Sequence, residues 1–410
     1  MQNIKKQFPI FSRPEAGSRY GGTNHPNMIY LDSAATTQTP SVVIDAMNDY
    51  YTKTRSNVHR GIYDLSEQAT AAYEAARASI AKFLNAEREE IIFTSGTTHG
   101  LNLLAYSLTP KLSHRDNVVL TRLEHHANLV PWQQMAKHYG FTIRYIELTP
   151  EDELDLASAE KVIDANTKIV SFALVSNVLG TVAQAKKISE FAHARRALTI
   201  VDAAQAVAHL PIDVENLDCD FLVFSGHKLY GPTGIGVLYS KKALLEESLE
   251  PFFFGGDMIK SVSYTDATWA ELPERFEAGT QNISGVIGLG AAVEWLASLG
   301  WDKIVAHERE MMAYALDKLK NEVTIIGPAI GHIHRVGVIA FTIPSIHPHD
   351  IAEILNQDNI CIRVGFHCAE PLHRHLGAGP TARASFGVYT TKEDIDKLVK
   401  GIEKVKKIFA

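Results

Sequence analysis

The side chain most suited to covalent chemistry in this chain is Lys228, which ends the run FSGHK after an apolar segment. A lysine at the end of a buried strand loses water, so its pKa falls toward the range in which the amine is a nucleophile. Such an amine can hold an aldehyde-bearing cofactor, and Ser225 and His227 beside it can bind a phosphate. The alternative is a surface lysine or one that only contacts a phosphate. The Gly-rich stretch 231–236 that follows predicts a close approach of backbone.

Two further segments predict a site for an aromatic ring and a site for a phosphate. Asp202 ends the apolar run LTIVD, and ligands of open α/β sheets bind beyond the carboxyl ends of strands. An acid there can face a protonated pyridine nitrogen or, alternatively, cap the next helix. Thr97 and Thr98, in GTTHG, can form an anion site at a helix N-terminus, although Thr97 is also an ordinary N-cap candidate. The run matches neither a dinucleotide fingerprint nor a P-loop.

Polar residues also follow the neighbouring predicted strands. His125 lies in EHHAN and can stack on an aromatic ring or relay a proton. With His126 it is also a possible metal pair, but no cysteine or carboxylate spacing supports that alternative. Asn177 follows the strand-like run 168–173 and belongs to the same predicted edge of the sheet.

Of the three cysteines, Cys368 has the most reactive context. It lies in GFHCAEP, where Gly and Pro predict a loop, and Arg363 and His367 are expected to lower its pKa from about 8.5. Cys219 and Cys361 lie in apolar runs and are expected to be buried. An unremarkable exposed thiol is the alternative for Cys368.

Arg383, in TARAS, precedes the strand-like run 386–389. A guanidinium suits two-pronged capture of a carboxylate, and a surface ion pair is the alternative.

Read in order, GTTHG, EHHAN, VSNVLGT, VDAAQA, FSGHKLYGPTGIG, FEAGT, RVGFHCAEPL and RASFGVY resemble the pyridoxal-phosphate-dependent cysteine desulfurases of the SUF type (group II), in the class V aminotransferase group. The similarity runs from about Tyr30 to the C-terminus. It implies conversion of L-cysteine to L-alanine, with sulfur passing to an enzyme persulfide and then to an acceptor protein of the SUF system for iron–sulfur cluster assembly. A selenocysteine lyase or cysteine sulfinate desulfinase of the same fold is the alternative, and an inactive acceptor-binding scaffold is the alternative of another class.

The resemblance implies a role for each candidate residue. Lys228 would carry pyridoxal 5'-phosphate and move the α-proton, and Cys368 would be the persulfide-forming nucleophile. The cofactor phosphate would be held by Thr97, Thr98, Ser225 and His227, and the cofactor ring would be contacted by His125, Asp202 and Gln205. The substrate would be contacted by Asn177, Arg363, Arg383 and His59. Thr280 would reach the cofactor phosphate of the partner in a homodimer. His59 and Thr280 would lie at the dimer boundary.

This chain departs from the family at His99, where a Glu near the dimer interface is usual. The histidines of the run 347–349 and of the run 373–375 are a possible metal site, against the alternative of a solvated face and a Pro-started helix. The run HPHD from 347 also resembles relatives that use a zinc-bearing sulfur acceptor.

Alternating strand-like and helical runs predict the elements that position these residues. The strands are expected at 91–94, 118–121, 143–146, 169–173, 198–202 and 221–224, with helical patterns between most of them. This order predicts an α/β fold with a doubly wound, mostly parallel sheet, which the resemblance identifies as the type I fold of PLP-dependent transferases. The expected domains are an arm over 1–27 that packs on the small domain, a large cofactor-binding domain over 28–299, and a small α+β domain over 300–410.

Composition narrows the function classes. The 410 residues are 46% hydrophobic and 21% charged, as in globular proteins, and the net charge of −7 argues against nucleic-acid binding. No apolar run approaches the ~20 residues that span a bilayer, and the N-terminus lacks the apolar core of a secretory signal. Three cysteines fit a reducing compartment, so a cytoplasmic location is expected.

Overall fold

The computed structural model describes residues 4–11, 28–328 and 335–410, so most of the expected N-terminal arm over 1–27 lies outside the described residues. A seven-stranded sheet has the order β2-β8-β7-β6-β5-β3-β4. Its strands are β2 (Ile91–Thr94), β3 (Asn117–Thr121), β4 (Thr142–Ile146), β5 (Thr167–Ala173), β6 (Leu198–Asp202), β7 (Phe221–Ser225) and β8 (Gly236–Ser240). Only β8 runs antiparallel to its neighbours, β2 and β7, and the other pairs are parallel. The predicted mostly parallel sheet is confirmed, and β8 is the strand that the sequence reading missed.

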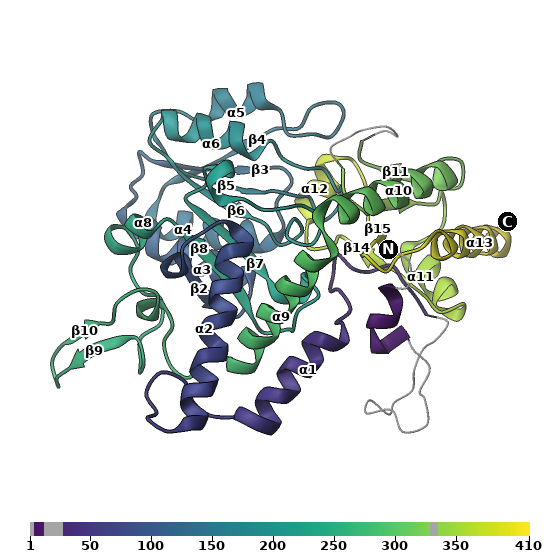
Figure 1. Cartoon of the computed structure of the whole chain (residues 1–410). Helices are drawn as coiled ribbons and strands as arrows, with labels where there is room; N and C mark the ends of the chain where they lie inside the picture. The colour runs from purple at the N-terminus through teal and green to yellow at the C-terminus, as the bar shows by residue number, and fades with distance from the viewer. Residues whose placement is uncertain (1–3, 12–27, 329–334) are drawn as a thin grey trace.

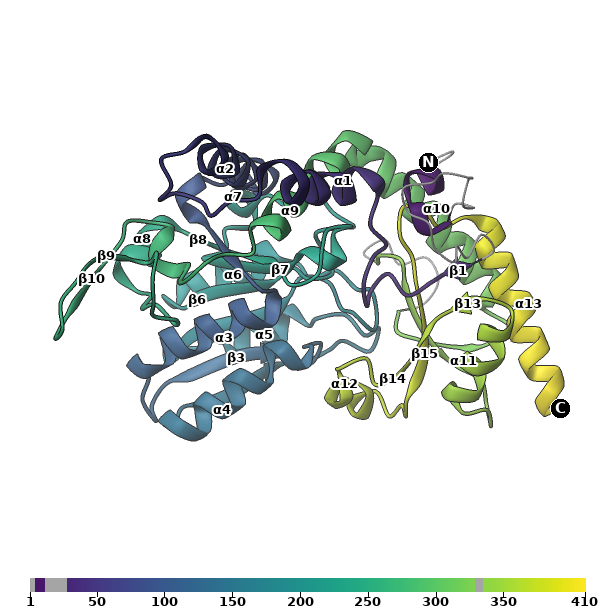
Figure 2. The ribbon, with the colours of Figure 1, turned by 90° about the horizontal axis from the view of Figure 1, so that it is seen from below.

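Helices cover both faces of this sheet because successive strand residues point to opposite sides. Val118 and Leu120 pack in the core beneath one helical layer, whereas Val119 packs in the core on the other face. Figure 2 shows the two layers, which consist of α3 (Thr97–Leu108) and α4 (Val130–Tyr139) on one side, and α1 (Ser41–Asp49), α2 (Asp64–Leu84) and α9 (Ile283–Leu299) on the other. The doubly wound arrangement is therefore as predicted.

A second, smaller layered unit follows α9. Its antiparallel sheet has the order β11-β12-β15-β14, with strands β11 (Thr324–Ile326), β12 (Val338–Thr342), β14 (Arg363–Gly365) and β15 (Thr381–Ser385). A separate core joins this sheet to α10 (Trp301–Leu319), α11 (Pro348–Gln357) and α13 (Lys392–Phe409). Gly300 separates α9 from α10, which are bent by 78°. This break adjoins the domain boundary expected at Leu299, which stays a prediction.

The remaining elements complete the fold around the two sheets. They are β1 (Ile29–Tyr30), which pairs with β13 (Ile360–Cys361), α5 (Leu156–Val162), α6 (Ala185–Ala194), α7 (Val214–Leu217), α8 (Lys242–Glu247), the hairpin of β9 (Ile259–Val262) and β10 (Ala267–Trp269), and α12 (Glu370–His375). Figure 1 shows the hairpin projecting from the body of the molecule. Among the described residues no single helix is long and apolar enough to cross a membrane, although α9 and α10 together would pass on length and composition.

Two expected strands of the small domain are wrong in detail. The apolar run 359–364 around Cys361, which predicts a single strand, is divided into β13 and β14, and Cys361 is half-buried rather than buried. The apolar run 386–389 is not a strand, because its backbone turns at Gly387, whose N–H donates to Thr390 Oγ1. Its hydrophobicity reflects burial in the core, and the strand is β15 just before it.

The described part of the N-terminal arm packs through Phe8. This ring is fully buried and lies edge-on against Trp295 of α9 and Tyr389, at centroid distances of 5.5 and 4.9 Å. Lys5 also pairs with Asp394 of α13 at 2.6 Å. The arm thus contacts α9 and the C-terminal part of the chain together.

Candidate active site

A cavity of about 260 Å³ opens where the carboxyl ends of the parallel strands face β14 and β15. The residues that line it are Ala34, Ala35, Thr97, Thr98, His125, Ala127, Ala173, Val175, Asn177, Asp202, Ala204, Gln205, Ser225, His227, Lys228, Arg363, His367, Cys368 and Arg383. Twelve of the fourteen candidate residues are in this set, and His59 and Thr280 are not. The fold therefore brings together side chains that are up to 286 residues apart (97 to 383).

One end of the cavity is a small hydroxyl cradle. Helix α3 begins right after Gly96, whose φ of 146° favours glycine. The backbone N–H of Thr97 donates to Ser225 Oγ at 2.8 Å, and the two hydroxyls are also 2.8 Å apart. Thr97 therefore bonds to Ser225 instead of capping α3. A Cβ on Gly236 would lie 2.5 Å from Gly96 Cα, so the predicted close approach of backbone is confirmed. Free N–H groups of a helix start and two hydroxyls suit a phosphate.

Asp202 and Lys228 lie in the middle of the cavity, at the ends of β6 and β7. Asp202 Oδ1 accepts a hydrogen bond from Ala204 N at 2.9 Å, so this acid both caps the following turn and lines the cavity. Burial lowers the pKa of Lys228 and raises that of Asp202. A buried amine that gives up its proton easily is the nucleophile that the sequence predicts.

His125 and Gln205 complete the walls around this centre. His125 Nδ1 accepts from Ala127 N at 3.0 Å, which places the ring proton of the neutral imidazole on Nε2. Burial, together with the nearby Lys228 ammonium, lowers the pKa of His125 to about 3, so the ring is neutral near pH 7. Gln205 Nε2 donates to Ala34 O at 2.7 Å. A neutral ring suits stacking and proton transfer but not charge pairing.

The other end of the cavity is positively charged. Arg383 on β15 donates through Nη1 to Asn177 O at 3.0 Å and through Nη2 to Asp32 Oδ1 at 3.1 Å. Its Nε is buried and has no hydrogen-bond partner in the described structure. Arg363 lies opposite Arg383 in the β14–β15 register and is exposed. Since buried donors are rarely left unpaired, this end fits a bound anion such as a carboxylate.

Cys368 is exposed at the cavity on a tight turn. His367 and Cys368 have φ values of 50° and 55°, two successive left-handed residues. The turn is fixed by His126 N, which donates to Cys368 O at 2.7 Å, and by Asn177 Nδ2, which donates to His367 O at 2.7 Å. The predicted loop is confirmed. The expectation that His367 adds positive charge is wrong, because burial and then Arg383 lower the pKa of His367 to about 2.

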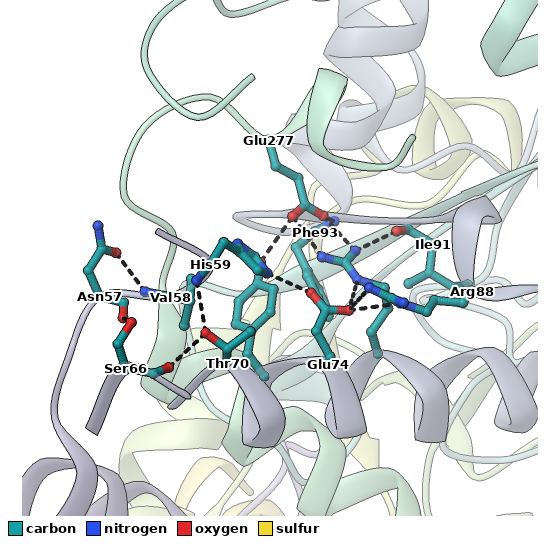
Figure 3. Close-up of polar contacts among 12 residues, drawn as sticks. Asn57, Val58, His59, Ser66, Thr70, Glu74, Arg88, Ile91, Phe93 and Glu277 are labelled. Atoms are coloured by element: carbon teal, nitrogen blue, oxygen red, sulfur yellow. Dashed lines mark hydrogen bonds and ion pairs between the residues drawn. The ribbon is translucent and has the colours of Figure 1, made fainter. Parts of the chain in front are cut away.

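His59 and Thr280 lie apart from the cavity of their own chain. His59 is joined through Nε2 to Glu74 Oε1 at 2.8 Å, in the network drawn in Figure 3. His59, Glu74 and Glu274 are the one group of the described residues with metal-like spacing, but Glu74 already pairs with two arginines. Thr280 is exposed in the turn before α9.

The alternative metal pairs are not supported. His126 Nε2 accepts from Glu370 N at 3.2 Å, so this ring anchors the cysteine turn beside His125. His347 Nδ1 accepts from His349 N at 3.3 Å and caps α11, which is the predicted Pro-started helix.

Three acidic residues of this region escaped the sequence reading. Asp32 accepts from Arg383, Glu277 pairs with the buried Arg77, and Glu124 accepts from Asn128 in the segment of His125. Glu124 accepts from Thr121 Oγ1 at 2.5 Å, and burial raises its pKa to about 8. The position of Glu124 beside His125 in EHHAN could have indicated its role. The role of Asp32 could not be read from the sequence, because its partner Arg383 is 351 residues away.

The chain matches the family model "Aminotransferase class-V" over residues 29–398 and belongs to that family. A probable cysteine desulfurase of Halalkalibacterium halodurans is 49% identical over 410 residues, covering 99% of this chain and 98% of the relative. The cysteine desulfurase of Haloferax volcanii is 44% identical over 416 residues, covering 99% and 97%. The apo structure of the cysteine desulfurase from Thermococcus onnurineus NA1 has a TM-score of 0.92 and 39% identity, and it covers 98% of this chain and 97% of that one.

These similarities confirm the main predictions. The fold is that of PLP-dependent type I enzymes, the cofactor is pyridoxal phosphate, and the activity is that of a cysteine desulfurase acting on L-cysteine. The cavity fits this cofactor on its own chemistry, since it combines a phosphate cradle, a buried acid and a buried amine.

Proposed function

We propose that this cavity is the active site of a SUF-type cysteine desulfurase in which Lys228 binds the cofactor and Cys368 accepts the sulfur. One observation carries the proposal: Lys228, Asp202 and Cys368, from two strand ends and a turn of the small domain, line a single cavity. The predicted roles of the other lining residues follow from their places around these three.

Pyridoxal phosphate, when bound, withdraws electrons from the substrate's α-carbon. The buried Lys228 amine would take the proton from that carbon, since its lowered pKa leaves the amine free of its own proton more often. Asp202 would face the ring nitrogen. Thr98, Ser225 and His227 would hold the phosphate, with Thr97 behind them, and His125 and Gln205 would flank the ring.

The charged end of the cavity would orient the substrate. Arg383, with its unpaired Nε, would bind the carboxylate, and the exposed Arg363 would close on it from β14. Cys368 Sγ then attacks the substrate sulfur. The S–S bond forms as the Cβ–S bond breaks, the electrons of the broken bond stay with carbon, and protonation of that carbon gives L-alanine. His125, neutral with its proton on Nε2, is placed to deliver a proton.

The variant Cys368→Ala tests the sulfur step. It should bind L-cysteine and still change the cofactor absorbance, but release almost no persulfide or sulfide, whereas Cys361→Ala should keep wild-type turnover. Activity on selenocysteine or cysteine sulfinate should survive in part, because those leaving groups depart without thiolate attack. Wild-type alanine release by Cys368→Ala would exclude this cysteine as the nucleophile. A wild-type preference for selenocysteine or sulfinate over L-cysteine would favour the alternative activities.

We also propose a homodimer. Thr280 is exposed, and neither Thr280 nor His59 lines the cavity of its own chain, which supports a role of both residues in the active site of a second copy. Mixing inactive Lys228→Ala with inactive Thr280→Ala should restore activity, because one site of the mixed dimer is intact. A fully active monomer by light scattering would refute the dimer.

The sulfur would pass to a small acceptor protein of the SUF system that feeds iron–sulfur cluster assembly. The tight turn of Cys368, held at both His367 O and Cys368 O, restricts how far the persulfide can move and so supports a partner that comes to it. All three cysteines are free, which supports a cytoplasmic location. Turnover that is already fast in a mild reductant, and that no acceptor improves, would refute this step.

A further inference from the structure

Asp32 contacts both arginines at the charged end of the cavity. Its Oδ1 accepts from Arg383 Nη2 at 3.1 Å, and its Oδ2 lies 3.8 Å from Arg363 Nη1. Across the described part of the chain, these two arginines are the only hydrogen-bond or ion-pair partners of this carboxylate. The described residues that line the cavity include both arginines but not Asp32. One carboxylate outside the cavity is therefore shared by the two cations that are proposed to receive the substrate carboxylate.

The backbone fixes the place of Asp32. Ser385 N donates to Leu31 O at 2.8 Å, and Ser33 N donates to Ser385 O at 3.3 Å, so the chain on both sides of Asp32 is bonded to the end of β15. Leu31 N also donates to Cys361 O at 2.9 Å, at the end of β13. The Asp32 side chain is only 16% exposed. Asp32 is thus built into this end of the cavity, unlike a mobile surface acid whose ion pairs contribute little.

The two arginines are held unequally. Arg383 is 3% exposed and also donates to Asn177 O at 3.0 Å, so its guanidinium is fixed while its Nε has no partner in the described structure. Arg363 is 51% exposed, and its 3.8 Å ion pair with Asp32 is longer than a hydrogen bond. The contact with Arg383 therefore orients a buried cation. The contact with Arg363 only balances the charge of a side chain that can move.

We propose that Asp32 is a positioning residue and the resident counter-ion of the substrate-carboxylate site: it orients Arg383, and it pairs with Arg363 until a substrate carboxylate replaces it. The inference rests on the proposed binding of the substrate carboxylate by these two arginines. A negative charge beside this site weakens the binding of every carboxylate there, because like charges repel. Asp32 thereby also limits the affinity for L-alanine, the product that must leave after each turnover.

Asp32→Asn and Asp32→Ala separate the hydrogen bond from the charge. Asp32→Asn keeps an oxygen for Arg383 Nη2 but removes the charge, whereas Asp32→Ala removes both. In Asp32→Asn the dissociation constant of L-alanine, read from the cofactor absorbance of the holoenzyme, should fall about tenfold, the scale of one charge removed from a partly solvated site. The KM for L-cysteine should fall with it. Asp302→Asn, at an exposed position of α10, is the matched control and should change neither constant.

The rate of persulfide formation in a single turnover reports the orientation of Arg383. This rate should not change in Asp32→Asn and should be about tenfold slower in Asp32→Ala, because only the second variant loses the hydrogen bond to the guanidinium. A merely structural role of Asp32 would instead weaken L-alanine binding and slow the reaction in both variants. If Asp32→Asn does not fold, Asp32→Ser supplies a second neutral side chain, and L-alanine should again bind more tightly than in the wild type.

An L-alanine dissociation constant that is unchanged or larger in the folded neutral variants would overturn the inference. The same titration of Arg383→Lys separates this failure from that of the proposed function. If Arg383→Lys leaves the dissociation constant of L-alanine unchanged, the proposed carboxylate site itself is wrong. If Arg383→Lys weakens L-alanine binding while the loss of the Asp32 charge does not strengthen it, only the role of Asp32 is refuted.

Discussion

Asn177 and His367 join the segment that follows β5 to the turn that carries Cys368. Asn177 Nδ2 donates to His367 O at 2.7 Å, while Asn177 O accepts from Arg383 Nη1 at 3.0 Å. One residue at the end of a large-domain loop thus holds both the cysteine turn and the arginine at the charged end of the cavity. Its predicted contact with the substrate is therefore accompanied by a structural one.

Replacing Asn177 by Ala should loosen the cysteine turn. One lost hydrogen bond of about 1 kcal/mol predicts roughly a fivefold slower persulfide formation and faster alkylation of Cys368 by iodoacetamide. Rapid mixing and peptide mass spectrometry measure the two rates. Slower alkylation in Asn177→Ala would contradict this interpretation, and Asn216→Ala, at an exposed position of α7, is the matched control.

Lys228→Ala should abolish turnover of L-cysteine by about a thousandfold or more, because no base is left for the α-proton. The wild type should give a borohydride-stable cofactor adduct that peptide mass spectrometry places on Lys228. Lys242→Ala, an exposed lysine of α8, should behave as the wild type. A stable adduct on another lysine would contradict the assignment.

Arg383→Lys should raise the KM for L-cysteine by roughly ten- to a hundredfold, the cost of about 1.5–3 kcal/mol for a charge-assisted contact. A lysine cannot reach Asn177, Asp32 and a carboxylate at once. Arg363→Lys should have a smaller effect because that side chain is half-exposed, at 51%. Steady-state kinetics measure both KM values. An unchanged KM in Arg383→Lys would mean that another residue binds the substrate carboxylate.

Arg77 of α2 forms a buried ion pair with Glu277, which is labelled in Figure 3. This pair should contribute strongly to the stability of the contact between α2 and the segment before α9. Arg77 Nη1 and Nη2 lie 2.8 and 2.9 Å from the carboxylate oxygens, and the side chains are 0% and 3% exposed. Glu277→Gln removes the buried carboxylate and leaves Arg77 only the ion pair with Glu74, so it should cost about 3–5 kcal/mol in the free energy of unfolding. Urea unfolding measures the loss. The double variant Arg77→Met with Glu277→Gln should recover part of it, and a milder cost for either single change alone would contradict the pairing.

Acid should lower the free energy of unfolding because His367 must be buried without a proton. Its pKa is about 2 when folded and about 6.5 when unfolded, so between these values the unfolded chain binds the extra proton. The free energy of unfolding should therefore fall as the pH drops below about 6.5, by roughly 1 kcal/mol per pH unit from this group. Urea unfolding at pH 7, 6 and 5 should show a shallower fall in His367→Asn. The exposed His375→Gln should keep the wild-type slope, and an unchanged slope in His367→Asn would contradict the prediction.

The sequence alone determined the parallel sheet and most of the cavity. Lys228, Asp202 and His125 each follow an apolar strand, and the carboxyl ends of parallel strands meet at one edge. Strand ends are local features, so residue order was enough to gather these side chains. The position of Cys368 on a loop was similarly predicted from the Gly and Pro around it.

Only the tertiary structure decided the charge states and the long-range partners. His367 appears in the sequence as a cation beside Cys368, but burial against Arg383 makes it neutral. Asp32 and Glu277 lie 351 and 200 residues from the arginines they hold, and no local pattern specifies such pairs. Desolvation and hydrogen bonding depend on which surfaces meet after folding, and therefore the chemistry of a side chain is settled only when its neighbours are in place.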